Sequence, residues 1–162
     1  MLSIRLFYLL PIYISVHIEL KKEYEINADI DDVWQFFNDI NKITSCIPNL
    51  EDVKIEKNGF KAKIKPPFSF IKGKFRIESE INEVKDNTMK ITMKGSSIGS
   101  SFYMLFHITF SDNTKIEITV TAETYGLLKT IPKSLIHKIV EDIETPMLKC
   151  IKDRLERSNN SA

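Results

Sequence analysis

The sequence FYMLFHITFSDNTKIEITVTA, residues 102–122, decides the fold. Its apolar side chains occupy alternate positions on both sides of a polar turn at Asp112-Asn113. They are Phe102, Met104, Phe106, Ile108 and Phe110 before the turn, and Ile116, Ile118, Val120 and Ala122 after it. A period of two is typical of strands that turn one face toward a core. The stretch therefore predicts two antiparallel strands with one apolar face and one polar face.

The same alternation recurs throughout the chain. Further strands are expected at residues 53–55, 60–64, 75–81 and 89–93, and another at 16–26, where Lys22 breaks the pattern. The sequence Lys57-Asn58-Gly59 predicts a hairpin turn, and residues 95–101 (GSSIGSS) predict a longer turn between strands. Together these segments predict a sheet of seven antiparallel strands.

Helical signals appear at both ends of the run of strands. Asp29 is a candidate N-cap for a short helix, and a second helical segment at 40–46 ends before Ile47-Pro48, because the residue before proline disfavours helical conformation. A long helix is expected from near Pro132, with an apolar stripe over about six turns and a kink at Pro146.

Residues 1–15 differ in character from the rest. The run LFYLLPIYISV at 6–16 follows Arg5, as in a signal peptide, but no small-x-small cleavage site follows it, and it is shorter than the roughly 20 residues of a membrane-spanning helix. A targeting or anchoring segment, an extra strand, and a loose extension from an upstream start codon all stay open. We expect a single domain at 16–157 between this apolar extension and a polar tail at 158–162.

Charge and cysteine usage narrow the function classes. The chain has 23 basic and 22 acidic side chains and a net charge of +1, so attraction to nucleic acid is not expected. Cys46 and Cys150 match no metal-binding or redox spacing, which predicts two free thiols in a reducing, cytoplasmic compartment. His17, His107 and His137 share no ligand spacing, so neither a metal nor a cofactor is expected.

The apolar face of such a sheet must be covered, and one long amphipathic helix is available to cover it. Because a helix is only about 10 Å across, it need not fill the concave side of a curved sheet. The remaining space is either packed by side chains or open to an apolar ligand, and periodicity leaves both interpretations open. The expected lining of such a cavity is Phe36, Phe37, Phe75, Ile77, Met89, Ile91, Met104, Phe106, Ile108 and Ile139.

Three motifs carry a family resemblance. They are Ala28-Asp29-Ile30-Asp31-Asp32-Val33-Trp34, Ser45-Cys46-Ile47-Pro48-Asn49-Leu50-Glu51 and Ile71-Lys72-Gly73-Lys74-Phe75. These motifs, and the order of strand, two short helices, six strands and long helix, resemble the CoxG family of carbon monoxide dehydrogenase subunits, within the START-like (SRPBCC) superfamily. The resemblance covers roughly residues 18–156. It implies an α+β helix-grip fold, in which a seven-stranded antiparallel sheet wraps around a long C-terminal helix.

The resemblance also implies a function. It implies non-enzymatic binding of a hydrophobic small molecule, such as a lipid or quinone, by a cytoplasmic protein that is peripheral to the membrane. The implied partners are a molybdenum hydroxylase, such as carbon monoxide dehydrogenase, or a membrane surface. Two departures weaken the link to that enzyme: Asn49 replaces the glycine that follows Cys-Ile-Pro in the family, and Pro66-Pro67-Phe68 replaces its glycine-proline before Lys-Gly-x-Phe.

A polyketide cyclase-like enzyme acting on an apolar substrate is the alternative. Such an enzyme needs a buried acid or base poised near neutrality. The inward polar positions of the sequence are Ser79, Thr124 and Tyr24, which could orient a substrate but do not supply such a group. We therefore expect no catalytic residue.

Lysines at positions 61, 63, 65, 72 and 74 form a basic stripe. The stripe is either a solvated sheet face or a patch that faces a membrane or a protein partner.

Overall fold

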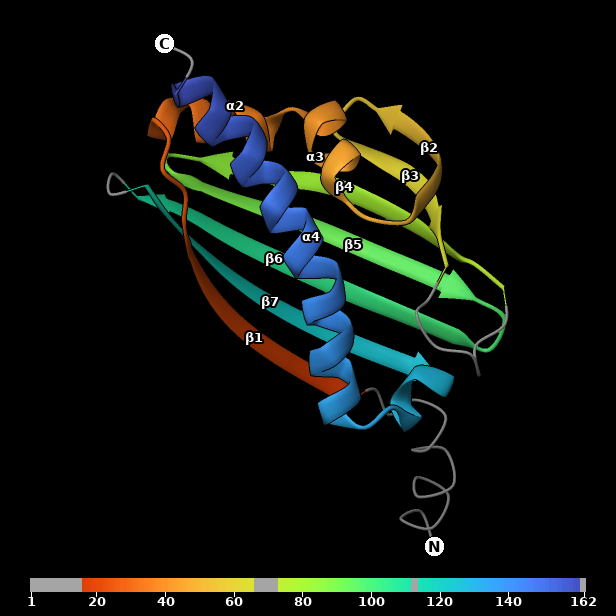
Figure 1. The fold of residues 1–162 in the computed structure, drawn as a ribbon. Coiled ribbons are helices and arrows are strands. Elements are labelled where there is room, and N and C mark those ends of the chain that lie inside the picture. The colour runs from red at the N-terminus through yellow and green to blue at the C-terminus, as the bar shows by residue number, and fades with distance from the viewer. Residues whose placement is uncertain (1–15, 66–72, 112–113, 161–162) are drawn as a thin grey trace, which may run out of the picture.

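The computed structural model describes residues 16–65, 73–111 and 114–160. Seven strands form one curved antiparallel sheet (Figure 1). They are β1 (Val16–Glu25), β2 (Leu50–Glu56), β3 (Gly59–Ile64), β4 (Phe75–Lys85), β5 (Thr88–Ser97), β6 (Ser100–Ser111) and β7 (Lys115–Gly126). The spatial order β1-β7-β6-β5-β4-β3-β2 is a six-stranded meander to which β1 adds beside β7.

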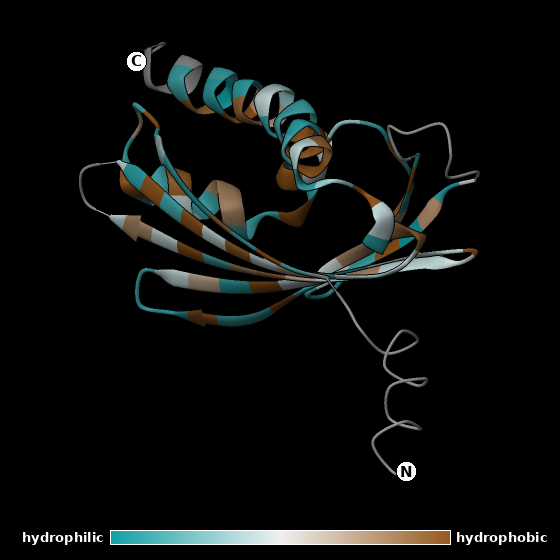
Figure 2. Ribbon diagram, turned by 90° about the horizontal axis from the view of Figure 1, so that it is seen from below, coloured by the Kyte–Doolittle hydropathy of each residue, from teal (hydrophilic) through white to brown (hydrophobic). Residues whose placement is uncertain are grey.

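The helices lie on one side of this sheet. Helices α2 (Ile30–Asn38) and α3 (Ile40–Cys46) connect β1 to β2, and a short 3-10 helix, η1 (Leu127–Thr130), leads from β7 to α4 (Lys133–Asn160). The Asp29 carboxylate caps α2 by accepting a hydrogen bond from the Asp31 backbone N–H at 3.0 Å. Helix α4 crosses the concave face of the sheet, above strands whose residues alternate between hydrophobic and hydrophilic (Figure 2). None of the helices in the described segments is long and apolar enough to span a bilayer.

The predicted helix-grip architecture is confirmed, with its seven strands, two short helices and long C-terminal helix. Helix α4 continues through Pro146 to Asn160, and so extends into the segment expected to be a polar tail. The expectations for residues 1–15 and for Pro66-Pro67 fall outside the described residues.

The turn predicted at residues 95–101 is much shorter than expected. Strands β5 and β6 extend into it and pair Gly95 with Phe102, which leaves only Ile98 and Gly99 between the strands. A Cβ on Gly95 would overlap the Phe102 ring, which lies 5.7 Å from the Phe75 ring between centroids. Gly95 is therefore a packing position inside a strand, where the missing side chain makes room for an aromatic ring.

The prediction of two free thiols is wrong. Cys46, the last residue of α3, forms a disulfide with Cys150 of α4, and their Cα atoms lie 5.5 Å apart. The two cysteines are 104 residues apart, so rules based on local spacing had no signal to detect. Because disulfides persist mainly in oxidising compartments, the cysteines no longer support the expectation of a cytoplasmic location.

The buried core is divided into two clusters. The first joins α2, the strands beneath it and the C-terminal part of α4, and it holds Val33 and Met89, both 0% exposed. The second joins β3, β4 and η1 at the other end of α4, and it holds Phe60 and Phe75. The clusters lie at the two ends of the concave face, so the middle of that face belongs fully to neither.

Candidate ligand-binding site

Two rows of side chains, which we call the middle rows, cross the concave face between the two clusters. One row is Ser79, Met93, Met104, Ala122 and Ile18, and the other is Ile81, Ile91, Phe106, Val120 and Leu20, each from β4 to β1. All ten side chains are only half-buried, although nine of them are apolar. The rows on either side are fully buried at Ile77 and Gly95 and at Met89 and Ile108. A soluble protein normally covers such a continuous apolar surface or uses it to bind.

Helix α4 supplies the opposite wall. Ile136 packs against the second cluster and Met147 against the first. Between them on the same stripe of the helix lie Ile139, Val140 and Ile143, which are half-buried. These three side chains therefore lie above the middle rows, so apolar residues face one another from the helix and the sheet.

The position of α4 is set largely by α3. The Cys46–Cys150 disulfide joins the two helices, and Arg154 Nη1 donates a hydrogen bond of 2.5 Å to Ser45 Oγ. The backbone of α4 approaches that of α3 more closely than that of any strand. The helix is thus anchored beside the sheet, and its middle turns are free of the tight packing seen at the two clusters.

A polar group closes the β1 side of the space below α4. Lys22 Nζ lies 3.7 Å from Glu144 Oε2, and Tyr24 forms a side-chain hydrogen bond with the same carboxylate. Burial, followed by the hydrogen bond and the charge of Glu144, raises the pKa of Tyr24 well above its usual value of 10.0. Lys22, which broke the alternation of β1, therefore points inward because α4 provides its counter-charge.

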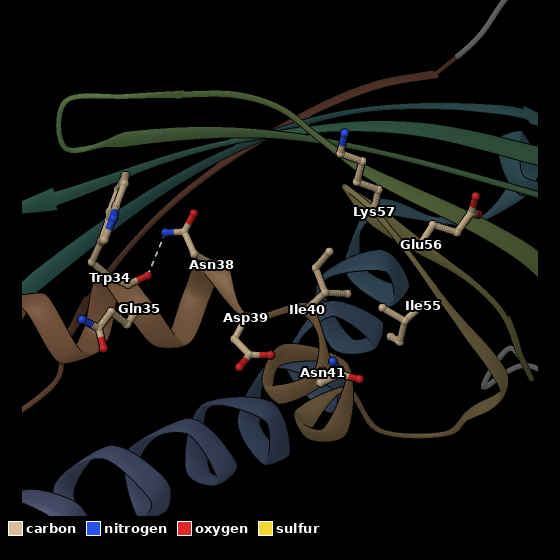
Figure 3. Close-up of a pocket in the computed structure, with 9 residues that line it drawn as sticks. All are labelled: Trp34, Gln35, Asn38, Asp39, Ile40, Asn41, Ile55, Glu56 and Lys57. Atoms are coloured by element: carbon tan, nitrogen blue, oxygen red, sulfur yellow. Dashed lines mark hydrogen bonds between the residues drawn. The ribbon is translucent and has the colours of Figure 1, made fainter.

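An open cleft of about 470 Å³ lies at the opposite, β4 side (Figure 3). Its lining comes from the α2–α3 corner and the β2–β3 hairpin: Trp34, Gln35, Asn38, Asp39, Ile40, Asn41, Ile55, Glu56 and Lys57. Asn58, next to Lys57, accepts a 2.7 Å hydrogen bond from the backbone N–H of Ile81, where one middle row begins. The Trp34 ring packs edge-on against Phe110, with centroids 5.0 Å apart. The cleft therefore lies beside the β4 end of the middle rows.

The ten residues expected to line a cavity fall into two groups. Four are half-buried and face the space between α4 and the sheet: Ile91, Met104, Phe106 and Ile139. The other six belong to the fully buried clusters: Phe36, Phe37, Phe75, Ile77, Met89 and Ile108. The six contribute to the packing that frames the middle rows.

Sequence reasoning missed several residues of this surface. They are Ile18 and Leu20 on β1, Ile81 on β4, Met93 on β5, Val120 and Ala122 on β7, and Val140 and Ile143 on α4. Alternation assigned the strand residues to the apolar face, but it gives no information on which rows a helix leaves uncovered. The pairing of β1 with β7, which places Leu20 beside Val120, is a long-range feature without a local signal.

The remaining candidate residues lie away from this surface. His17, His107 and His137 are exposed, and the described part of the chain holds no group of three His, Cys, Asp or Glu side chains suited to a metal. In the basic stripe, Lys61 lies near Glu56 and Glu78, at 3.8 and 3.7 Å. Lys63 and Lys74 also have carboxylate partners, in Asp52 and Glu51. This pairing with β2 and β4 favours a solvated sheet face.

The fold and the apolar space under α4 define a START-like helix-grip protein, and comparison with solved structures agrees. A conserved protein from Geobacillus kaustophilus is 17% identical with a TM-score of 0.75, covering 87% of this chain and 97% of its own. A START superfamily protein from Mycobacterium smegmatis is 12% identical with a TM-score of 0.61, covering 88% and 99%. Major latex-like protein 151 from Panax ginseng is 12% identical with a TM-score of 0.60, covering 86% and 98%.

The family follows from the sequence match. The model of the CoxG family of carbon monoxide dehydrogenase subunits matches residues 23–156, and the chain belongs to that family. A search of curated proteins finds no match.

Two of the motifs that carried the resemblance have a clear structural role. Asn49, at the position of the family's glycine, has a φ of 64°, and Gly73 of the Lys-Gly-x-Phe motif has a φ of 87°. Glycine adopts this left-handed region at no steric cost, and asparagine tolerates it better than most other residues. The departure at Asn49 therefore preserves the backbone conformation that the motif requires.

Proposed function

We propose that this protein binds a hydrophobic small molecule, such as a lipid or a quinone-like compound, between the middle rows and α4 without altering it chemically. The observation that carries the proposal is the half-exposed state of nine apolar side chains between two fully buried clusters. Removing apolar surface from water is favourable by about 25 cal/mol per Å², so a ligand that covers this surface gains affinity from burial alone. The cleft beside β4 is a natural route of access for it.

Dye binding by two matched variants tests this proposal. Met104 and Leu105 are neighbours on β6, both half-buried, and they point to opposite faces of the sheet. In M104Q a ligand must cover an amide, so the Kd for the apolar dye 1-N-phenylnaphthylamine should rise about tenfold. In L105Q the Kd should stay at the wild-type value. Equal affinities for all three proteins, or no uptake by the wild type, would contradict the proposal.

The family membership supports an accessory or recruitment role toward a molybdenum hydroxylase such as carbon monoxide dehydrogenase. The tagged protein, expressed in its own host, should co-purify the large subunit of such an enzyme above the level seen with an unrelated bait. Peripheral association with the membrane is a second part of this role, and it is tested by flotation of the protein with vesicles of host lipid. Background levels in both experiments would leave ligand binding without a recruitment role.

A cyclase-like enzyme is the alternative, and one observation favours it. The Tyr24–Glu144 pair places a phenol and a carboxylate at the edge of an apolar space, where they could orient a substrate. If the protein is an enzyme, Y24F should lose turnover of an apolar polyketide substrate while it keeps the affinity for that substrate. If wild-type protein returns the ligand chemically unchanged after prolonged incubation, the binding function stands.

A further inference from the structure

Two hydroxyl groups on the concave face lack hydrogen-bond partners. Ser100 Oγ and Thr124 Oγ1 are shielded from solvent, and neither bonds to another group of the described chain. Ser100 is only 5% exposed as a whole residue. Buried polar atoms of native proteins are nearly always paired, so two such oxygens on one face need an explanation.

The two hydroxyls lie close together at one end of the candidate site. Thr124 pairs with Phe102, and Ser100 pairs with Gly126, so Ser100 and Thr124 are diagonal neighbours on the same face of β6 and β7. Thr124 follows Ala122 on this face, and Ala122 belongs to a middle row. The Thr124 side chain as a whole is half-buried, so the residue borders the same open surface as Ala122.

We propose that these hydroxyls receive the polar end of the ligand, and that the ligand is an apolar molecule with a terminal carbonyl group. This inference rests on the proposed binding function. A carbonyl oxygen has two lone pairs, and serine and threonine hydroxyls each have one hydrogen to donate, so one oxygen can satisfy both groups. The apolar body of the ligand then lies along Ala122 and Met104 under α4.

An unpartnered hydroxyl lowers the stability of the free protein, because it gave up its hydrogen bonds to water and gained none in return. The ligand restores those bonds. Removal of the Thr124 hydroxyl should therefore have opposite effects on the two properties: the ligand-free protein becomes more stable, and a carbonyl ligand binds less tightly. A position with a purely structural role has no such opposition.

The test compares two ligands of nearly equal shape on two variants. T124V replaces the hydroxyl by a methyl group, and T121V makes the same change on the opposite face of β7, at another half-buried threonine. The probes are 2-acetylnaphthalene, which carries a carbonyl, and 2-ethylnaphthalene, which does not. T124V should raise the Kd for 2-acetylnaphthalene about 5- to 20-fold, in line with the loss of one or two hydrogen bonds, and leave the Kd for 2-ethylnaphthalene unchanged. T121V should change neither.

Stability supplies a second readout. Without ligand, T124V should raise Tm by about 2–4 °C relative to wild type, as expected for about 1 kcal/mol in a chain of this size. S100A should weaken 2-acetylnaphthalene binding in the same direction. If T124V affects both probes equally or neither of them, this inference is overturned and the binding function stands. If wild-type protein binds neither probe, both proposals are overturned.

Discussion

Asn49 shows how one residue supports the fold. It lies between α3 and β2 with a φ of 64°, in the region where most side chains meet steric conflict with the backbone. The segment turns there from the α3 helix, which carries the disulfide, into the edge strand of the sheet. Its conformation therefore influences how α3, and through it α4, is placed.

Substitution at this position tests that interpretation. N49V should lower the free energy of unfolding by about 1–2 kcal/mol, because a β-branched side chain is strained at positive φ. N49G should stay within about 0.5 kcal/mol of wild type, since glycine relieves strain but adds entropy to the unfolded chain. Urea denaturation of the three proteins measures both. Equal losses in the two variants would show that the asparagine side chain matters, and not the backbone conformation.

The residue scale is also where prediction from sequence is least complete. Alternation placed Met104 and Met89 on the same apolar face, and the structure agrees. It could not show that Met104 is half-buried and Met89 fully buried, because this difference depends on where α2 and α4 lie. Thr124 appeared only as one inward polar residue among several, since its lack of a partner is a property of the packed molecule.

At the scale of elements, the placement of α4 depends on three connections. The Cys46–Cys150 disulfide and the Arg154–Ser45 hydrogen bond attach it to α3, and Glu144 attaches it to β1 through Lys22 and Tyr24. Together they hold the helix on both sides of the space above the middle rows. Loss of either attachment should therefore affect stability and ligand binding together.

Removal of the disulfide should have a large effect. It closes a loop with a sequence separation of 104 residues, so C150S should lower the free energy of unfolding by about 2–4 kcal/mol. Wild-type protein treated with a reducing agent should unfold at the same denaturant concentration as C150S. Intact mass after alkylation under denaturing conditions should show two free thiols only in the reduced sample. A wild-type midpoint that does not respond to reduction would contradict this role.

The Tyr24–Glu144 pair predicts a dependence on pH. The pKa of Tyr24 is raised in the folded protein, so above its unfolded value of 10.0 the unfolded chain loses this proton before the folded one does. Stability from this group is therefore complete below pH 10 and declines as the pH rises further. The urea midpoint of wild type should fall more steeply than that of Y24F between about pH 10 and 11.5. Parallel declines would show that Tyr24 does not contribute.

At the scale of the whole molecule, the fold could be predicted because its signals are local and repeated. Each strand carries its own alternation, Asp29 marks the start of α2, and α4 has one long apolar stripe. The disulfide and the division of the core into two clusters could not be predicted, since both arise from contacts between distant segments. The candidate site is a product of that division, so it became visible only with the assembled chain.

A crystal structure of the complex with 1-N-phenylnaphthylamine tests the central claim most directly. The account predicts density for the dye between the middle rows and α4, in contact with Met104, Val120 and Ile139. Density in the open cleft between Trp34 and Lys57, with the space under α4 filled by protein side chains, would contradict it.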